Sequence, residues 1–222
     1  RHGNGHRHDS LAFAIETAGA RTAMPSTPPP LPQDIHIETL TGEALVRRID
    51  DLAALRIAVF RDWPYLYDGS ADYERRYLAT YATAAGSVVV AATNRPGGRM
   101  VGAATGLPMR HEPTSLTGPM AASGYDIDRL FYFGESVLLP GWRGTGIGVA
   151  FFAAREAHAR GLGGFTHACF CGVARPQNHP RRPADAVSLD GFWHRRGYAP
   201  VAGAIGCDIE TTKPMQFWAR AL

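Results

Sequence analysis

Short runs rich in apolar and β-branched residues recur along the chain, the first of them alternating with polar residues over 35–40, and each run predicts a β-strand. We expect strands over residues 35–40, 87–93, 100–107, 131–139, 165–173, 203–209 and 214–220. The second and third runs flank Asn94–Gly98, a turn that contains glycine and proline, so these two runs predict a hairpin.

Between these runs, apolar residues recur at every third or fourth position, which is the spacing of one helix face. We expect helices over residues 43–62, 71–84, 146–160 and 186–196. In the first helix, Leu52, Arg56 and Val59 fall near one stripe. Residues 108–130 are polar and irregular, with room for a short helix.

The order of elements, β-α-α-β-β-β-α-β-α-β-β, predicts one α/β domain with a mixed sheet over residues 35–222. Residues 1–34 differ in character, because Arg1–Asp9 is rich in histidine and arginine and Ser26–Pro32 is rich in proline. We expect residues 1–34 to be an N-terminal extension, either a tag or upstream sequence, with Met24 as a candidate natural start.

Composition excludes several classes of protein. A chain of 222 residues fits one domain, and a net charge of +3 does not suggest a nucleic-acid partner. No apolar run reaches the roughly 18 residues of a transmembrane helix, so we expect no membrane partner. The three cysteines, Cys169, Cys171 and Cys207, argue by their odd number and spacing against a disulfide framework and a metal site. These features favour a reducing, cytoplasmic location.

A basic, glycine-rich turn connects the strand that ends at Leu139 to the following helix, and it reads Arg143-Gly144-Thr145-Gly146-Ile147-Gly148. The backbone N–H groups of such a turn and the positive end of the helix dipole point at one small volume, which suits a phosphate or pyrophosphate. The glycine spacing differs from that of a dinucleotide-binding fingerprint, and no lysine of a Walker loop lies near. The turn therefore predicts a different phosphorylated cofactor.

The remaining pattern, Arg143-x-x-Gly146-x-Gly148 between a strand and a helix, resembles the acetyl-CoA pyrophosphate loop of the GCN5-related N-acetyltransferases, the GNAT family. The order of elements over residues 35–222 is also similar to that of the family. The resemblance implies an α/β fold with a mixed, mostly antiparallel central sheet of about seven strands flanked by about four helices. It further implies an enzyme that moves acetyl from acetyl-CoA to a primary amine.

By the same resemblance, acetyl-CoA lies in a splay between the strand that ends at Leu139 and the strand over residues 165–173. The backbone of Val137, Leu138 and Leu139 is expected to pair with the pantetheine arm. The pyrophosphate is expected on the amides of Arg143, Gly144, Thr145, Gly146, Ile147 and Gly148, and the Arg143 side chain adds a charge-assisted contact. Asn178 corresponds to an asparagine of the family that touches the pantetheine.

Glu135 is the candidate general base. Alternation places Phe131, Phe133, Val137 and Leu139 on its strand face, and a carboxylate among such groups should have a raised pKa, which suits a base near neutrality. Many members of the family place a catalytic glutamate on this strand. The alternative is a structural glutamate that is hydrogen-bonded within the sheet or to the preceding loop.

The general acid is less clear. The segment Phe192–Tyr198 resembles the end of a helix in the family, where the usual acid is a tyrosine four residues before a glycine. Here that position is Trp193, which cannot protonate a thiolate. Tyr132 and Cys171 are candidate substitutes, and departure of the thiolate into solvent would need no acid. Cys171 as an acylated nucleophile would imply ping-pong kinetics, and we prefer direct transfer.

The loop Arg175–Pro183 is dense in cations and follows the strand that would face the acceptor. Arg175, His179 and Trp193 are the candidate acceptor-binding residues, and the two cations suit an acceptor with a carboxylate or phosphate. The alternative is a solvated basic loop that prolines stiffen. We expect a small-molecule or peptide amine as acceptor, and the terminal strands would allow a homodimer.

Two other functions stay open. A catalytically silent acyl-CoA-binding module is indicated by Trp193 at the position of the acid. A nucleic-acid-binding protein would use the basic loop, but the small net charge argues against this class.

Overall fold

The computed structural model describes residues 31–176, 178–207 and 214–222, so residues 1–30 of the expected N-terminal extension lie outside the described part. The strands are β1 His36–Leu40, β2 Val88–Thr93, β3 Met100–Pro108, β4 Leu130–Tyr132, β5 Ser136–Leu138, β6 His167–Val173, β7 Ala199–Cys207 and β8 Pro214–Ala221. The helices are α1 Gly42–Val46, α2 Ile49–Phe60, α3 Ala71–Thr83, α4 Thr114–Ala122, α5 Ile147–Leu162 and α6 Asp190–His194, with 3-10 turns η1 Met109–His111, η2 Ile127–Arg129 and η3 Pro140–Trp142.

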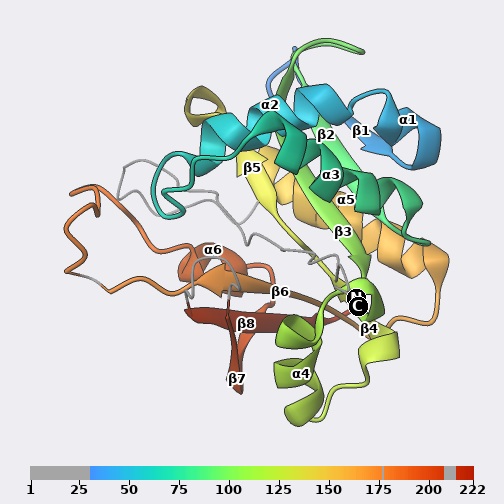
Figure 1. Cartoon of the computed structure of the whole chain (residues 1–222), viewed down its shortest axis with the longest axis vertical. Coiled ribbons are helices and arrows are strands. Elements are labelled where there is room, and N and C mark those ends of the chain that lie inside the picture. The colour runs from blue at the N-terminus through green and yellow to red at the C-terminus, as the bar shows by residue number, and fades with distance from the viewer. Residues whose placement is uncertain (1–30, 177, 208–213) are drawn as a thin grey trace, which may run out of the picture.

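An eight-stranded sheet forms the centre of the molecule (Figure 1). Seven strands follow the order β1-β2-β3-β4-β6-β8-β7, and β5 pairs with β3 off this path. The pairing of β4 with β6 is parallel, and the other pairings of the described strands are antiparallel. The predicted mixed, mostly antiparallel sheet is therefore confirmed, with one strand more than the seven expected.

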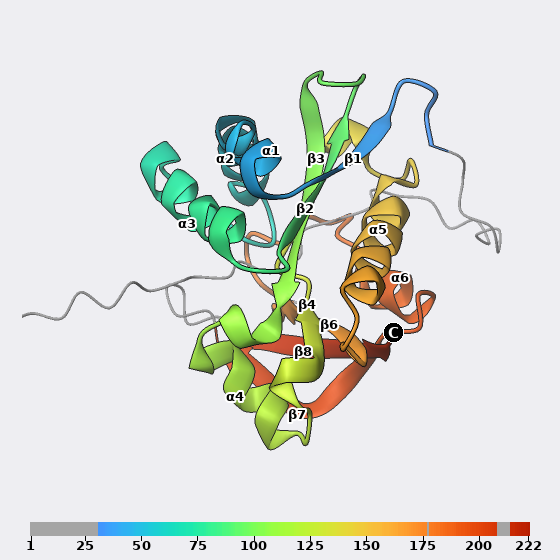
Figure 2. The same ribbon diagram turned by 90° about the vertical axis from the view of Figure 1, so that its right-hand side faces the viewer.

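Helices cover both faces of the sheet. Figure 2 shows α1, α2 and α3 on one side of β2 and β3, and α5 on the other. Strand β2 is buried along its whole length because it contributes to both layers: Val89 packs into the cluster that includes residues of α2 and α3, and Val88 and Val90 pack into the cluster that includes residues of α5. A strand covered on both faces reads as a continuous apolar run, as this one does.

Two of the expected helices differ in extent from the prediction. The helix expected over residues 43–62 is broken at Arg47 and Arg48 into α1 and α2. The helix expected over residues 186–196 is the five-residue α6, because Ser188 Oγ accepts a hydrogen bond from Asp190 N at 3.2 Å and so favours a turn before the helix. The other expected helices are present as α3 and α5, and the short one as α4.

The strand expected over residues 131–139 is two strands, β4 and β5, with a break at Gly134 and Glu135. Only glycine fits this break, because a Cβ atom at Gly134 would collide with Tyr81 Oη and with Thr105 Oγ1. The break shifts the alternation of side chains. Phe131 and Phe133 pack in the α5 layer, whereas Val137 packs in the α2–α3 layer. The expectation that they share one strand face with Glu135 is wrong for the two phenylalanines.

The terminal strands form the far end of the sheet. β8 lies between β6 and β7, and β7 is an edge strand. β7 begins four residues earlier than expected, at Ala199, and its register against β8 shifts between Pro200 and Ile205.

Within the described residues, none of the helices has the length and hydropathy that a bilayer crossing requires.

Candidate functional site

The pairing between β4 and β6 ends at Tyr132, and β5 then continues the chain without pairing to β6. Tyr132 of β4 lies opposite Cys169 of β6, and Phe133 N donates to Cys169 O at 2.8 Å. After this point β5 pairs with β3, while the rest of β6 pairs with β8. No pairing between β5 and β6 occurs in the described part of the chain, so the two strands separate where the resemblance implies a splay.

The hydrogen bonds of β5 decide which of its backbone groups are directed toward β3 and which are directed away from it. Leu139 N donates to Val101 O at 2.9 Å, and Thr105 N donates to Glu135 O at 3.0 Å. Because bonded and non-bonded residues alternate in an antiparallel pair, Val137 also directs its backbone to β3, and Leu138 directs its backbone away from β3. Of the three residues predicted to contact a pantetheine arm through their backbone, only Leu138 directs its backbone groups away from β3.

The glycine-rich turn lies at the far end of β5. Gly144 and Gly146 have φ angles of 78° and 89°, in the left-handed region that glycine adopts without strain. Thr145 Oγ1 donates to Trp142 O at 2.6 Å and holds the turn, and α5 begins directly after Gly146. The backbone amides of residues 144–148 donate none of the hydrogen bonds between described residues, as expected at a helix start. The residues present therefore fit an anionic group such as a pyrophosphate.

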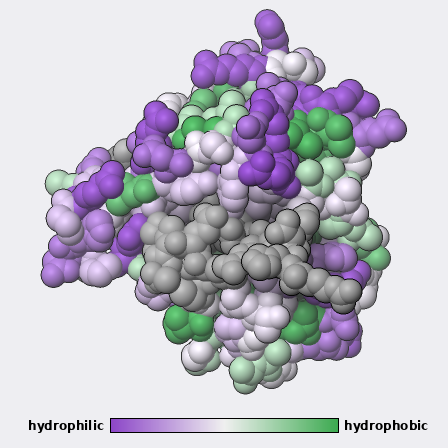
Figure 3. Space-filling view, viewed as in Figure 1, coloured by the Kyte–Doolittle hydropathy of each residue, from purple (hydrophilic) through white to green (hydrophobic). Residues whose placement is uncertain are grey.

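A cleft of about 390 Å³ lies beside this turn. Three arginines from separate segments line it: Arg61 after α2, Arg143 of the turn, and Arg181 of the loop between β6 and α6. Asp62 and Asp185 also line it, so the charge is mixed. Figure 3 shows hydrophilic side chains gathered on the protruding loop between β6 and α6, at the left of the view. The cleft thus brings Arg143 of the turn beside arginines from two other segments.

Glu135 lies fully buried at the break between β4 and β5. Its Oε2 atom accepts a short hydrogen bond from Arg56 Nη1, and Arg56 Nε donates to Glu74 Oε2 at 2.5 Å. Arg56 and Glu74 are also completely buried. We call these three residues the buried trio. The sequence predicts an apolar setting for Glu135, and the structure instead surrounds its carboxylate with an ion-pair network.

Aromatic rings and a second arginine enclose the trio. The Arg56 guanidinium carbon lies 4.2 Å from the ring centroid of Tyr77 and 4.9 Å from that of Phe60. On the opposite face of the sheet, Arg155 of α5 donates to Glu135 O at 3.1 Å. Burial lowers the pKa of Arg155 to about 9, so its guanidinium stays protonated at neutral pH. Sequence reasoning missed Arg56, Glu74 and Arg155 as site residues, although Arg56 stands out as a charge on an apolar helix stripe.

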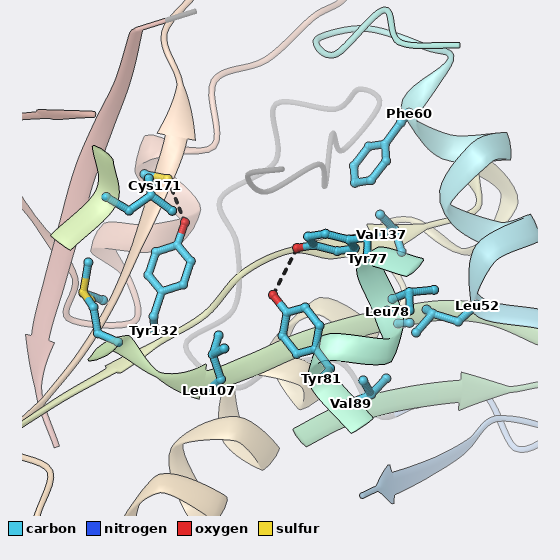
Figure 4. Packing of buried hydrophobic residues seen from close by; sticks show 14 of the residues in the cluster. Leu52, Phe60, Tyr77, Leu78, Tyr81, Val89, Leu107, Tyr132, Val137 and Cys171 are labelled. Carbon is cyan, nitrogen blue, oxygen red and sulfur yellow. Dashed lines mark hydrogen bonds between the residues drawn. The ribbon is translucent and has the colours of Figure 1, made fainter. Parts of the chain in front are cut away.

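Tyr132 and Cys171, the two candidate acids, are brought together. The Tyr132 hydroxyl lies 2.9 Å from Cys171 Sγ, and both side chains are fully buried near the mouth of the splay. Figure 4 shows this pair opposite Tyr77 and Tyr81, whose hydroxyl oxygens are 3.1 Å apart. Burial raises the pKa of Tyr81 well above its ordinary value, so that phenol stays protonated at neutral pH. The structure thus places hydroxyl and thiol groups on two sides of the same buried cluster.

Two of the predicted acceptor-binding residues, Arg175 and His179, contact the loop after α2. Arg175 Nη2 donates to Pro64 O at 2.7 Å, and the His179 ring lies 5.0 Å from that of Trp63. These contacts tie the loop after β6 to the loop after α2. The third candidate, Trp193, is a core residue that packs on other aromatic rings of the α5 layer.

Trp193 also approaches β6 closely, because a Cβ atom at Gly172 would lie 2.7 Å from its ring. This packing explains why a large indole occupies the position. Asn178, the candidate contact for the pantetheine, lies exposed on the loop between β6 and α6.

No protein-family model matches the sequence, and no relative is found among the curated proteins. Solved structures do match. A GCN5-related N-acetyltransferase from Kribbella flavida shares 14% identity, with 86% of this chain and 99% of that chain covered at a TM-score of 0.53. The chain has the GNAT fold.

Two further solved structures cover similar shares of the two chains, and each was solved with a cofactor. A proposed acetyltransferase from Salmonella typhimurium with acetyl-CoA shares 14% identity, covering 86% of this chain and 95% of that one at a TM-score of 0.55. An aminoglycoside 6'-N-acetyltransferase complexed with coenzyme A shares 14% identity, covering 84% and 96% at a TM-score of 0.55. The predicted GNAT fold is therefore confirmed, at an identity that speaks for the fold alone.

Proposed function

We propose that this protein is an N-acetyltransferase that moves acetyl from acetyl-CoA to a primary amine by direct attack in a ternary complex. One observation carries the proposal: β5, which does not pair with β6, leads into a turn whose unbonded amides fit a pyrophosphate. The two neighbours solved with acetyl-CoA or coenzyme A support acyl-CoA as the co-substrate.

In this proposal the chain grips the cofactor mainly through its backbone. The amides of residues 144–148 hold the pyrophosphate, and Arg143 adds charge from the cleft. Leu138 contributes its backbone N–H to the pantetheine arm, because Leu138 O already accepts a hydrogen bond from Arg143 Nε at 3.4 Å. The arm then runs along β5 toward Glu135, so the thioester lies at the break between β4 and β5, where the buried trio is.

The chemistry then needs a neutral amine and a leaving thiolate. The amine nitrogen attacks the thioester carbonyl, the C–S bond breaks, and the amine loses one proton. In this proposal Glu135, a buried carboxylate at the break between β4 and β5, receives that proton. The thiolate takes a proton from Tyr132, from Cys171 or from solvent. Holding both substrates at one break in the sheet supplies much of the rate.

A second function is favoured by specific observations. Glu135 pairs with a buried arginine, and the tryptophan in place of the usual acid is a core residue. Both features would suit a module that binds acyl-CoA without catalysis. Four points remain proposals from the sequence. They are a small-molecule or peptide amine as acceptor, a cytoplasmic location, a homodimer, and the lack of a nucleic-acid partner.

The two functions are separated by measuring thiol release from acetyl-CoA with a panel of amines, amino acids and peptides, alongside CoA binding by calorimetry. Turnover on at least one amine supports the enzyme. Binding without turnover on the whole panel supports the silent module.

A matched pair of variants tests the location of the site. Gly146→Glu adds a carboxylate at the start of α5, where it repels a phosphate and blocks the backbone, so we expect at least a 100-fold loss of CoA affinity. Gly161→Glu makes the same change at the other end of α5, where the added side chain meets open space. It should bind CoA as the parent does. Equal affinity of all three proteins would refute the assignment of the turn.

A further inference from the structure

The buried trio presents a difficulty for a general base. Arg56 binds the carboxylate of Glu135 directly. A positive charge in direct contact with a carboxylate favours the ionised form and lowers the proton affinity of the carboxylate. With Arg56 as its only charged neighbour, Glu135 would be a weak base near neutral pH. The structure contains the group that offsets this effect.

Glu74 shares the same guanidinium. Its Oε2 atom accepts from Arg56 Nε, next to the nitrogen that binds Glu135. Two buried carboxylates thus face one buried cation, and all three side chains are completely excluded from solvent. A like charge disfavours ionisation just as an opposite charge favours it. Within the trio there is one carboxylate more than the cation neutralises, and the second buried cation, Arg155, bonds the backbone oxygen of Glu135 rather than either carboxylate.

The hydrogen bonds within the trio are also incomplete. Glu135 Oε1, Glu74 Oε1 and Arg56 Nη2 are buried and have no hydrogen-bond partner among the described residues. Glu74 Oε1 points toward the loop after α2, because a Cβ atom at Gly69 would lie 2.7 Å from it. Leaving such atoms unpaired is costly, so each of the two carboxylate oxygens can still accept a proton or a hydrogen bond. Glu135 Oε1 is the oxygen of Glu135 that is left to accept it.

The neighbouring groups keep one protonation state through the neutral range. From α3, Tyr81 reaches the break at Gly134, and burial raises its pKa. From α5, Arg155 stays protonated below about pH 9. From β6, burial raises the pKa of Cys169, which lies opposite the end of β4. The other buried titratable groups of this cluster are Tyr65 of the loop after α2, Tyr77 of α3, Tyr132 of β4 and Cys171 of β6.

We propose that Glu74 is a positioning residue that keeps the proton affinity of Glu135 high by sharing the charge of Arg56. This inference rests on the proposed function, in which Glu135 receives the proton of the attacking amine. Arg56 holds the Glu135 carboxylate at the break between β4 and β5, and Glu74 prevents that ion pair from disabling the base. The proton acceptor is thus the trio rather than a lone glutamate.

The decisive experiment is an NMR titration of protein labelled with ¹³C at the glutamate side-chain carboxyls, with the Glu135 resonance identified by its loss in Glu135→Gln. In Glu74→Gln the midpoint of Glu135 should move to lower pH by about 1 unit, because a neighbouring negative charge is gone. In Arg56→Gln it should move to higher pH, because the positive charge is gone. An unchanged midpoint in either folded variant would overturn the proposal.

Glu156→Gln is the matched control, because Glu156 is also a buried, ion-paired glutamate, bound to Arg220 rather than to the trio. It should leave the Glu135 midpoint where it is. A shift as large as that of Glu74→Gln would mean that loss of any buried carboxylate has this effect, and would also overturn the proposal.

A kinetic arm separates this inference from the proposed function. With an amine that the parent protein acetylates, Glu74→Gln should move the acidic limb of kcat against pH to lower pH by about 1 unit, and should lower the plateau several-fold because a weaker base removes the proton. A merely structural role would reduce the folded fraction and leave the limb in place. If no amine is turned over but the NMR shift is found, the proposed function fails while the charge sharing stands.

Discussion

The glycine-rich turn, residues 143–148, and the buried trio lie at the two ends of β5 and are built in opposite ways. The turn consists of consecutive residues and offers mainly backbone amides, with no charge removed from water. The trio draws on α2, α3 and the break before β5, and consists of three charged side chains in a dry interior. One site depends on local conformation and the other on tertiary packing, so mutations should affect them differently.

The largest effect is expected at the trio. Arg56→Ala leaves two buried carboxylates without their cation, which should lower the free energy of unfolding by about 3–5 kcal/mol. Urea unfolding at neutral pH measures it. Arg76→Ala, on the exposed face of α3, is the control and should unfold like the parent. A fully stable Arg56→Ala protein would mean that the trio contributes nothing to folding.

The next effect tests the break that brings Glu135 to the trio. Gly134→Ala puts a Cβ atom against Tyr81 Oη and Thr105 Oγ1, so the free energy of unfolding should fall by about 1–3 kcal/mol. Gly141→Ala meets no atom within 4 Å and should change stability by less than about 0.5 kcal/mol. If the two variants unfold at the same urea concentration, the close packing at Gly134 is not a constraint.

At the turn, the cost is conformational. Gly146→Ala forces a residue with a side chain to adopt a φ of 89°, which should cost about 1–2 kcal/mol and weaken CoA binding several-fold. Gly161→Ala, in the same helix at ordinary φ and in open space, should stabilise by up to about 1 kcal/mol. Thermal unfolding and CoA titration measure both. Changes of the same sign in the two variants would contradict the role of the left-handed conformation.

The smallest effect is expected where the loops after α2 and β6 meet. Arg175→Ala removes hydrogen bonds to Pro64 O and Tyr65 O, and should lower the free energy of unfolding by about 1 kcal/mol. Arg181→Ala removes a neighbouring exposed cation of the same loop and should have no measurable effect on stability. If Arg175→Ala instead raises KM for the acceptor with unchanged stability, the sequence-based acceptor role is supported.

Much of the first region can be predicted from the sequence. The turn follows an apolar strand and opens an amphipathic helix, and the glycines at 144 and 146 adopt the left-handed conformations that glycine permits. The proposed phosphate contacts of this turn use backbone amides, which do not depend on the identity of the side chains. The hairpin of β2 and β3 and the helix α3 were equally predictable, since turn residues and periodicity specify them locally.

The second region could be predicted only in part. Arg56 falls on the apolar stripe of α2, which signals a buried charge, but nothing in the pattern names its partners, 18 and 79 residues further along the chain. The break at Gly134 was missed because the run from Phe131 to Leu139 keeps a strand-like composition through it. β4 pairs with both β3 and β6, whereas β5 pairs with β3 alone, and this difference is a property of the sheet rather than of the local sequence.

The sequence by itself therefore determined most of the order of elements, the glycine-rich turn and the resemblance to the GNAT fold, because these depend on residues near one another in the chain. Tertiary structure decided the rest. It joined Arg56 and Glu74 to Glu135, assigned Arg175 and His179 to a contact between loops, and placed Trp193 in the core. The physical reason is that a buried charge or ring takes its partners from residues that are distant in the chain, and only the fold determines which residues these are.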